Sequence, residues 1–414
     1  MPAQQISPLK KAIFSVAALM LFLFLFFIIG EVMFRIFRGA PNPLSRTTQL
    51  SQEYLFKPNS VLENRSSKHG EFSYTAHINR YGYRGADFAM PKEEGKLRVF
   101  AVGDSFTFGV GSQDNETIPY LIEENLKQQG LNTEVVNAGI GHASPLRHVV
   151  NFRNIHFKYG PDVVLLLLDM TDIQDDWRQE RYAVFDENGQ VKFFDTTYLN
   201  GKRSLWRTLA FYSAFCKYID QKVLTSWEKL RLLGLMGYIR VKQEEKRAKA
   251  VIVNAEEGAY PDSVLLEYDG FLMMRGKTRE RLIRQQFART GKYLLEIKQL
   301  LEERGIPMAL VMYPHGIYVG EDQWNEGRVT WGFEAGKQYS DRLPFEMVEA
   351  FAKANDIPFI NTLDAFLAAP KKQYFFDWDG HMTPEGNKIV ADVIVRSPAF
   401  QGILAQRQGI VKED

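Results

Sequence analysis

Two short stretches, separated by most of the chain, carry the residue types needed for nucleophilic catalysis. Ser105 ends a Gly-Asp-Ser segment that follows an apolar run, and His381 ends an Asp-Gly-His segment far along the chain. A serine hydroxyl is a weak nucleophile at neutral pH and needs an adjacent base, which an imidazole can supply. A carboxylate can fix the tautomer of that imidazole and stabilise the imidazolium. The residues therefore predict Ser105 as nucleophile and His381 as base.

Each stretch also has an ordinary structural interpretation. Gly-Asp-Ser is common turn chemistry, because glycine supplies a positive φ and the other two residues bond their own backbone. Thr383 followed by Pro384 is typical of a helix start, which places His381 on the loop before a helix. It is the combination of the two stretches that favours catalysis.

Together, the two stretches resemble the SGNH/GDSL hydrolases over about residues 95–170 and 280–400. The resemblance implies a flavodoxin-like α/β sheet and a Ser-His-Asp site, with Ser105 and His381 in the first two roles. Asp377 and Asp379 both precede His381, and neither has the usual Asp-x-x-His spacing. We favour Asp379, because related membrane-anchored members look similar with Asp-Gly-His.

The resemblance also implies an oxyanion hole built from three donors. The first is the N–H of Ser105, and the second is a glycine N–H, for which we favour Gly141 over Gly139. The third is usually an asparagine side chain, but Thr171 stands at that position here. A threonine hydroxyl donates one hydrogen bond, with a reach that differs from that of an amide.

The elements that must position these residues alternate between strands and helices. Unbroken apolar runs are typical of parallel strands covered on both faces, and alternation with helices favours βαβ units. We predict an α/β fold, a flavodoxin-like three-layer sandwich with a five-stranded parallel sheet, the number of strands following from the resemblance. The predicted strands are Leu97–Val102, Thr133–Asn137, Val163–Leu168, Met308–Tyr313 and Pro358–Ile360, and the predicted helices are Ile118–Gln129, Leu146–Tyr159, Glu280–Arg304, Phe345–Asn355 and Pro384–Arg396.

An uncharged apolar run from Ala12 to Gly30 follows two lysines. It is long enough to cross a bilayer as a helix, for which about 20 residues are needed. A cleaved signal peptide is the alternative, but no small-residue cleavage site follows the run, which favours an uncleaved signal anchor. Basic residues flank both ends, so charge does not decide the orientation. The resemblance to anchored members of the family implies a single-pass membrane protein with an extracytoplasmic catalytic domain, periplasmic or extracellular.

We predict five segments: a cytoplasmic tail and anchor (1–38), a linker leading into the domain (39–95), the first part of the SGNH-like domain (96–176), an insertion (177–277) and its second part (278–414). The insertion opens with a predicted hairpin that turns at Asn188-Gly189. An aromatic-rich, helical pattern follows over Leu205–Leu235. The insertion is either a lid that shapes the substrate pocket or an elaboration that packs on the core.

The composition and motifs give no sign of a nucleic-acid partner, a metal or a cofactor. The 414 residues carry a net charge of +1, which gives no reason to expect nucleic acid as a partner. The seven histidines and Cys216 show no metal-ligand spacing, and Gly109-Val-Gly111 lacks the rest of a phosphate-binding motif, so no metal or cofactor is implied. Of the other histidines, His142 and His315 are the candidates for substrate contacts.

The predicted function is a serine esterase that hydrolyses an acyl ester, acetyl among the candidates, in the cell envelope. The expected partners are an ester-bearing substrate, with a glycan as one candidate carrier, and the membrane. Two alternatives stay open. One is an O-acyltransferase acting on a cell-envelope polysaccharide, and the other is a non-catalytic envelope assembly protein on the same scaffold.

Overall fold

The computed structural model describes residues 8–38, 55–66, 69–180, 183–194, 213, 215, 277–331 and 333–411. The chain divides into two compact units. The first comprises Met1–Thr47 and Thr196–Glu244, and the second comprises Thr48–Asp195 and Glu245–Asp414.

The first unit contains the long helix α1, Pro8–Arg38. Its segment Phe14–Met33, 20 residues with a mean hydropathy of 2.6, is long and apolar enough to cross a membrane or to act as a signal sequence. Near its end, Glu31 accepts hydrogen bonds from the Ser213 hydroxyl at 2.6 Å and the Phe215 N–H at 3.1 Å. The rest of the predicted helical pattern over Leu205–Leu235 lies outside the described residues.

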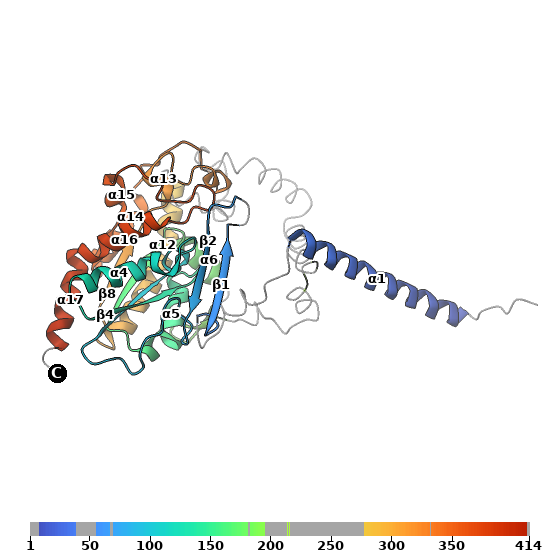
Figure 1. Cartoon of the computed structure of the whole chain (residues 1–414), viewed down its shortest axis with the longest axis horizontal. Coiled ribbons are helices and arrows are strands. Elements are labelled where there is room, and N and C mark those ends of the chain that lie inside the picture. Colours follow the sequence, from blue (N-terminus) through green and yellow to red (C-terminus); the bar gives the residue numbers. More distant parts are fainter. Residues whose placement is uncertain are drawn as a thin grey trace, which may run out of the picture. The chain divides into compact units, whose positions relative to one another are not determined.

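The second unit is built on a five-stranded sheet in the order β4-β3-β5-β8-β9, in which every neighbouring pair is parallel (Figure 1). This is the 2-1-3-4-5 order of the flavodoxin-like doubly wound sheet. The structure therefore confirms the predicted fold class. The strands are β3 (Leu97–Gly103), β4 (Thr133–Gly139), β5 (Val163–Leu168), β8 (Met308–Met312) and β9 (Phe359–Asn361).

Helices cover the sheet in two groups. In the first, α16 (Pro384–Arg396) packs on α4 (Ile118–Gln128) and α17 (Pro398–Val411). In the second, α12 (Lys277–Glu302) packs on α5 (Pro145–Asn154), α6 (Asp172–Glu180) and α14 (Leu343–Ala354). The crossovers through α4 and α5 leave in opposite directions along the sheet, so their right-handedness puts the two helices on opposite faces.

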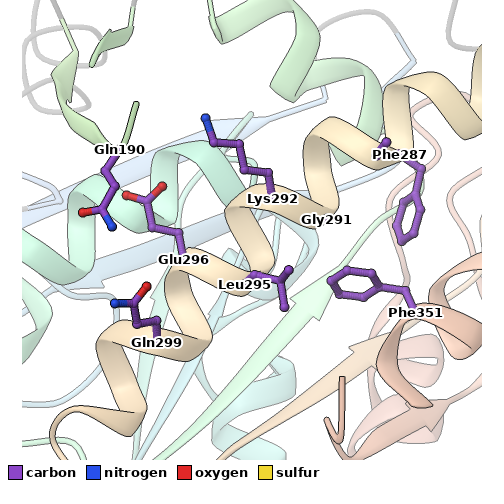
Figure 2. Close-up of a pocket in the computed structure, with 9 residues that line it drawn as sticks. Gln190, Phe287, Gly291, Lys292, Leu295, Glu296, Gln299 and Phe351 are labelled. Atoms are coloured by element: carbon purple, nitrogen blue, oxygen red, sulfur yellow. The ribbon is translucent and has the colours of Figure 1, made fainter. Parts of the chain in front are cut away.

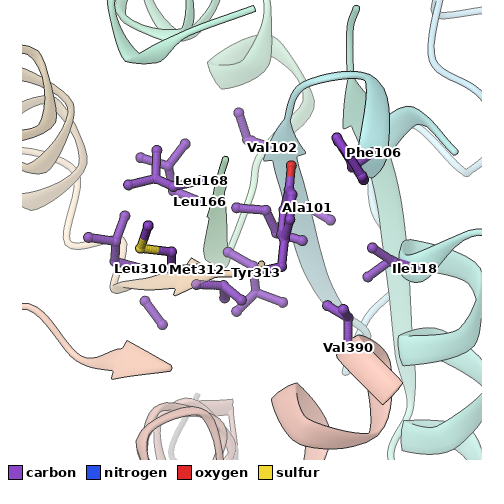
Figure 3. Close-up of a cluster of buried hydrophobic side chains, with 14 of the residues drawn as sticks. Ala101, Val102, Phe106, Ile118, Leu166, Leu168, Leu310, Met312, Tyr313 and Val390 are labelled. Atoms are coloured by element: carbon purple, nitrogen blue, oxygen red, sulfur yellow. The ribbon is translucent and has the colours of Figure 1, made fainter. Parts of the chain in front are cut away.

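The core lies between these layers. Every residue of β3, β5 and β8 is buried, which explains why β5 and β8 are continuous apolar runs and why β3 is apolar apart from Arg98. Figure 3 shows side chains from the three strands, among them Ala101, Leu166 and Leu310, together with Val390 of α16. These strands therefore form a rigid platform beneath the loops at their carboxyl ends.

The segment predicted as a linker contains a hairpin that the sequence reading missed. Strand β1 (Ser60–Arg65) pairs antiparallel with β2 (Ser73–Ile78). In β2 the side chains of Tyr74, Ala76 and Ile78 are buried and alternate with more exposed ones. That alternation is the available signal, but the polar residues between the two strands suggested only a loop.

Other element boundaries also differ from the prediction. A short helix, α3 (Ser105–Phe108), begins directly at Ser105, where the first helix was expected only from Ile118. The predicted helix Leu146–Tyr159 is two elements, α5 and the 3₁₀ helix η3 (His156–Tyr159). The predicted hairpin at Asn188-Gly189 is present. The remaining elements are β6 (Ala183–Phe185), β7 (Val191–Phe194), η2 (Asp114–Glu116), α13 (Gly316–Val319), η7 (Gly327–Trp331) and α15 (Leu363–Ala368).

Candidate active site

Ser105 lies at the carboxyl end of β3, at the sharp turn into α3. Asp104 caps this helix, its Oδ1 accepting a hydrogen bond from the Phe106 N–H at 2.9 Å. A Cβ atom on Gly103 would lie 2.2 Å from Thr107 Oγ1 and 2.9 Å from the Leu167 carbonyl oxygen, so the close turn requires glycine. Open α/β sheets bind ligands at this end of their strands, where the strand order reverses.

His381 links Ser105 to Asp379. Its Nε2 lies 2.8 Å from Ser105 Oγ, and its Nδ1 is hydrogen-bonded to Asp379 Oδ1. A carboxylate only accepts, so Nδ1 of a neutral imidazole carries the proton, and Nε2 accepts the hydrogen bond from the serine hydroxyl. The side chain of His381 is 22% exposed and that of Asp379 30%. The structure thus brings together the three residues predicted as nucleophile, base and acid, in an arrangement that can activate the serine.

Asp377, the alternative acid, has different partners. Its Oδ1 accepts hydrogen bonds from the backbone N–H groups of Asn325, at 2.8 Å, and Glu326, at 3.3 Å. Burial opposes the charge on Asp379, but its hydrogen bond to His381 and the charge of that ring hold the pKa of the carboxyl below its usual value. Asp379 is therefore the aspartate placed to orient and stabilise a protonated His381.

Glu71 holds the loop that carries these residues, a role that the sequence reading did not detect. Its Oε1 accepts a hydrogen bond from the Trp378 N–H at 2.8 Å, and its Oε2 accepts one from the Asp379 N–H at 2.9 Å. Glu71 precedes β2 and is more than 300 positions away in sequence from the loop. No local pattern marks such a partner, because the contact arises only when the β1–β2 hairpin meets the loop.

The predicted oxyanion donors differ in what they contact. The Gly139 N–H donates to Asn137 Oδ1 at 3.1 Å, whereas Gly141 lies in the turn that follows β4. The Thr171 hydroxyl donates to Asp169 Oδ2 at 2.6 Å. The proton of this hydroxyl is thus directed to Asp169 in this structure, away from the role predicted for it. Gly141 stays the predicted glycine donor.

A buried polar cluster underlies Ser105. His315 Nε2 is hydrogen-bonded to Asp169 Oδ1 at 2.5 Å, and the Tyr313 hydroxyl donates to Asp104 Oδ1 at 2.6 Å. Burial, with the nearby charge of Asp169, raises the pKa of Asp104 to about 6. The His315 residue is only 5% exposed, and its hydrogen bond to Asp169 joins the ends of β5 and β8. Its contact with a substrate stays a prediction.

His142, the other histidine considered for substrate contact, lies near the site. It follows Gly141 and adopts a positive φ of 58°, which is uncommon outside glycine. Burial lowers its pKa, and the charges of His381 and Arg178 lower it further, so His142 is close enough to His381 for the two rings to interact electrostatically. Its contact with a substrate stays a prediction.

One pocket of this unit lies on the surface of α12, apart from the predicted catalytic residues. Figure 2 shows a pocket of about 450 Å³ along α12, between the β6–β7 turn and α14. No predicted catalytic residue lines it; its lining residues are Gln190, Phe287, Ala288, Gly291, Lys292, Leu295, Glu296, Gln299 and Phe351. Over the described part of the chain, no group of three or more His, Cys, Asp or Glu residues is arranged to hold a metal ion.

No family model matches this sequence, and no curated protein does. Solved structures that align with it include an acetyl xylan esterase, with 15% identity over 72% of this chain and 98% of the other at a TM-score of 0.34. A G-D-S-L family lipolytic protein from Desulfitobacterium hafniense aligns with 11% identity over 72% and 98%, at a TM-score of 0.33. A family 3 carbohydrate esterase from Clostridium thermocellum aligns with 13% identity over 75% and 98%, at 0.34.

One of these structures is of a G-D-S-L family protein, the family that the two sequence stretches resemble. The fold of the second unit rests on its own strand order, and the chemistry of the site on its own contacts.

Proposed function

We propose that this protein is a serine esterase that hydrolyses an acyl ester through Ser105, His381 and Asp379. The observation that carries the proposal is the continuous hydrogen-bonded chain from Ser105 Oγ through both nitrogens of His381 to Asp379. A serine paired in this way with an oriented base is the arrangement that activates a hydroxyl for acyl transfer.

In the first step, Ser105 Oγ attacks the carbonyl carbon of the ester while its proton passes to His381 Nε2. Asp379 stabilises the imidazolium that forms. The bond from the carbonyl carbon to the alcohol oxygen then breaks, and the alcohol leaves with the proton from His381. In the second step, water attacks the acyl-serine, gives a proton to His381 and releases the carboxylic acid, and the proton returns to Ser105 Oγ.

The negative charge on the carbonyl oxygen needs donors that are already in place. We assign this role to the N–H groups of Ser105 and Gly141. Losing a single oxyanion donor costs about 100- to 1000-fold in rate in enzymes of this kind. Because the Thr171 hydroxyl donates to Asp169, we assign the hole two backbone donors.

The test uses the full chain purified in a mild detergent. A fluorophosphonate probe and p-nitrophenyl acetate are applied to the wild type, Ser105→Ala and His381→Ala. We expect labelling and hydrolysis in the wild type and the loss of both in each variant. Hydrolysis by Ser105→Ala at the wild-type rate would refute the proposal.

We further propose that α1 anchors the protein in a membrane and that the catalytic unit lies outside the cytoplasm. The apolar stretch Phe14–Met33 supports the anchor. The test is resistance of the native protein to extraction from membranes by alkaline carbonate, with protease added to spheroplasts to locate the catalytic unit. Release of the protein by carbonate would contradict the membrane anchor. Protection of the catalytic unit from the protease would contradict its location outside the cytoplasm.

A further inference from the structure

A large aromatic side chain stands exposed on the loop that carries His381. Trp378 is 40% exposed and lies three residues before His381. Tryptophan is highly buried on average in folded proteins. Leaving its ring in water forgoes a favourable burial energy, so a ligand that covers the exposed part of the indole gains that energy.

The indole is held flat against a second ring. The imidazole of His69 stacks on Trp378 with ring centroids 3.7 Å apart and planes 7° from parallel. His69 thus covers one face of the indole and fixes its orientation. The exposed part of the indole is therefore a planar aromatic platform, which we call the Trp378 platform.

The backbone beneath the platform is fixed as well. The Trp378 N–H donates to Glu71, and its carbonyl oxygen lies so close to Gly327 that a Cβ atom there would approach it to 2.0 Å. Asp377, the preceding residue, is tied to the backbone of Asn325 and Glu326. A ligand that covers the indole therefore meets a surface that is already ordered, which lowers the entropic cost of binding.

The groups around the platform favour one class of ligand. The face of an indole is electron-rich and attracts groups with a partial positive charge, such as the C–H bonds of a pyranose ring. Glu71 is hydrogen-bonded to the Trp378 N–H, and Asp377 precedes Trp378 in the chain. The carboxylates of both can accept hydrogen bonds from hydroxyl groups. An alkyl chain would be covered better by an enclosed apolar pocket, whereas a sugar ring presents one apolar face and a rim of hydroxyls.

The platform residue is also close to His381. Three residues of extended chain span at most about 11 Å, so the α-carbon of Trp378 lies within that distance of the α-carbon of His381. We propose that the Trp378 platform is a sugar-binding subsite, which holds a pyranose unit of the molecule whose ester is attacked by Ser105. This inference rests on the proposed esterase function and names the carrier of the ester.

The test compares two acetyl esters on the full chain. One is p-nitrophenyl acetate, which has no sugar, and the other is an acetylated xylo-oligosaccharide. In Trp378→Ala we expect kcat/KM for the oligosaccharide to fall roughly tenfold, mainly through KM, because one aromatic contact is lost. For p-nitrophenyl acetate we expect a change of less than twofold. Trp378→Phe should recover most of the loss, and Tyr120→Ala, which removes a similarly exposed ring (41%) from α4, should change neither substrate.

The outcomes separate this inference from the proposed function. Failure of the wild type to hydrolyse either ester would remove the esterase itself. Hydrolysis of p-nitrophenyl acetate without hydrolysis or binding of the oligosaccharide would overturn the sugar subsite alone. Equal losses on both substrates in Trp378→Ala would also overturn it, since they would show that the ring only supports the loop. Binding of the oligosaccharide to Ser105→Ala, and its loss in the double variant with Trp378→Ala, would support the subsite without any turnover.

Discussion

The hydrogen bonds from the catalytic loop to Glu71 lead to a prediction about catalysis. Glu71→Ala removes the acceptor of two backbone hydrogen bonds, at 2.8 and 2.9 Å, one of which is made by Asp379 itself. Hydrogen bonds to charged groups contribute about 1.5–3 kcal/mol each, and the lower end applies at a partly exposed site. If alignment of Asp379 with His381 costs about 1.5–3 kcal/mol more without these hydrogen bonds, kcat falls roughly 10- to 100-fold.

Two variants make this estimate specific. Glu71→Gln keeps one acceptor oxygen and loses the charge, so we expect a smaller loss of about three- to tenfold in kcat. Glu63→Ala removes an exposed acid from the same hairpin and serves as the matched control, with no expected change. Steady-state hydrolysis of p-nitrophenyl acetate gives kcat and KM for each variant, and thermal unfolding shows whether the fold is intact.

The expected signature is a loss in kcat with KM nearly unchanged. Such a loss indicates that an interaction needed for the chemical step has weakened, since substrate binding is preserved. A value of kcat in Glu71→Ala within twofold of wild type would refute the positioning role. An increase in KM at constant kcat would refute it too, because Glu71 would then contribute to substrate binding alone.

Three further predictions concern the acid, the turn beside Ser105 and a buried carboxyl group. Asp379→Asn should lower kcat by about 1000- to 10,000-fold, as loss of the acid does in the serine protease triad, with Asp377→Asn much less affected in the same assay. Gly139→Ala should destabilise the fold by several kcal/mol, roughly the upper end for overpacking, because its Cβ atom would lie 2.1 Å from the Phe108 backbone nitrogen; a thermal midpoint equal to that of the wild type would contradict this. Burial raises the pKa of Asp176 from 3.8 to about 7, so the folded state holds a proton there that the unfolded state releases, and stability is lost as the pH rises from 3.8 to 7. Asp176→Asn removes this titration. The free energy of unfolding of the variant, relative to that of the wild type, should therefore rise by about 2–3 kcal/mol between pH 5 and pH 8, measured by chemical unfolding. A difference independent of pH would show that Asp176 does not titrate in this range.

The sequence by itself indicated the strands of the sheet and the residues Ser105 and His381, whereas the number of strands and the preference for Asp379 came from the family resemblance. Strands such as Val163–Leu168 are apolar without interruption because both faces are covered, and this pattern is written in consecutive residues. Ser105 and His381 were found in the same way, since each occupies a short segment with its own turn chemistry. Local patterns of this kind need no knowledge of distant contacts.

Tertiary structure decided which groups meet. Asp379 and Asp377 are equivalent in type, and only the path of the loop places the first on His381 and the second on the turn at Asn325. Glu71 reaches the loop only because the β1–β2 hairpin packs beside it. The Thr171 hydroxyl is engaged by Asp169, two positions earlier, which in turn binds His315 of a different segment. These choices depend on the directions of side chains and on contacts between segments up to 308 positions apart, which spacing along the chain does not specify.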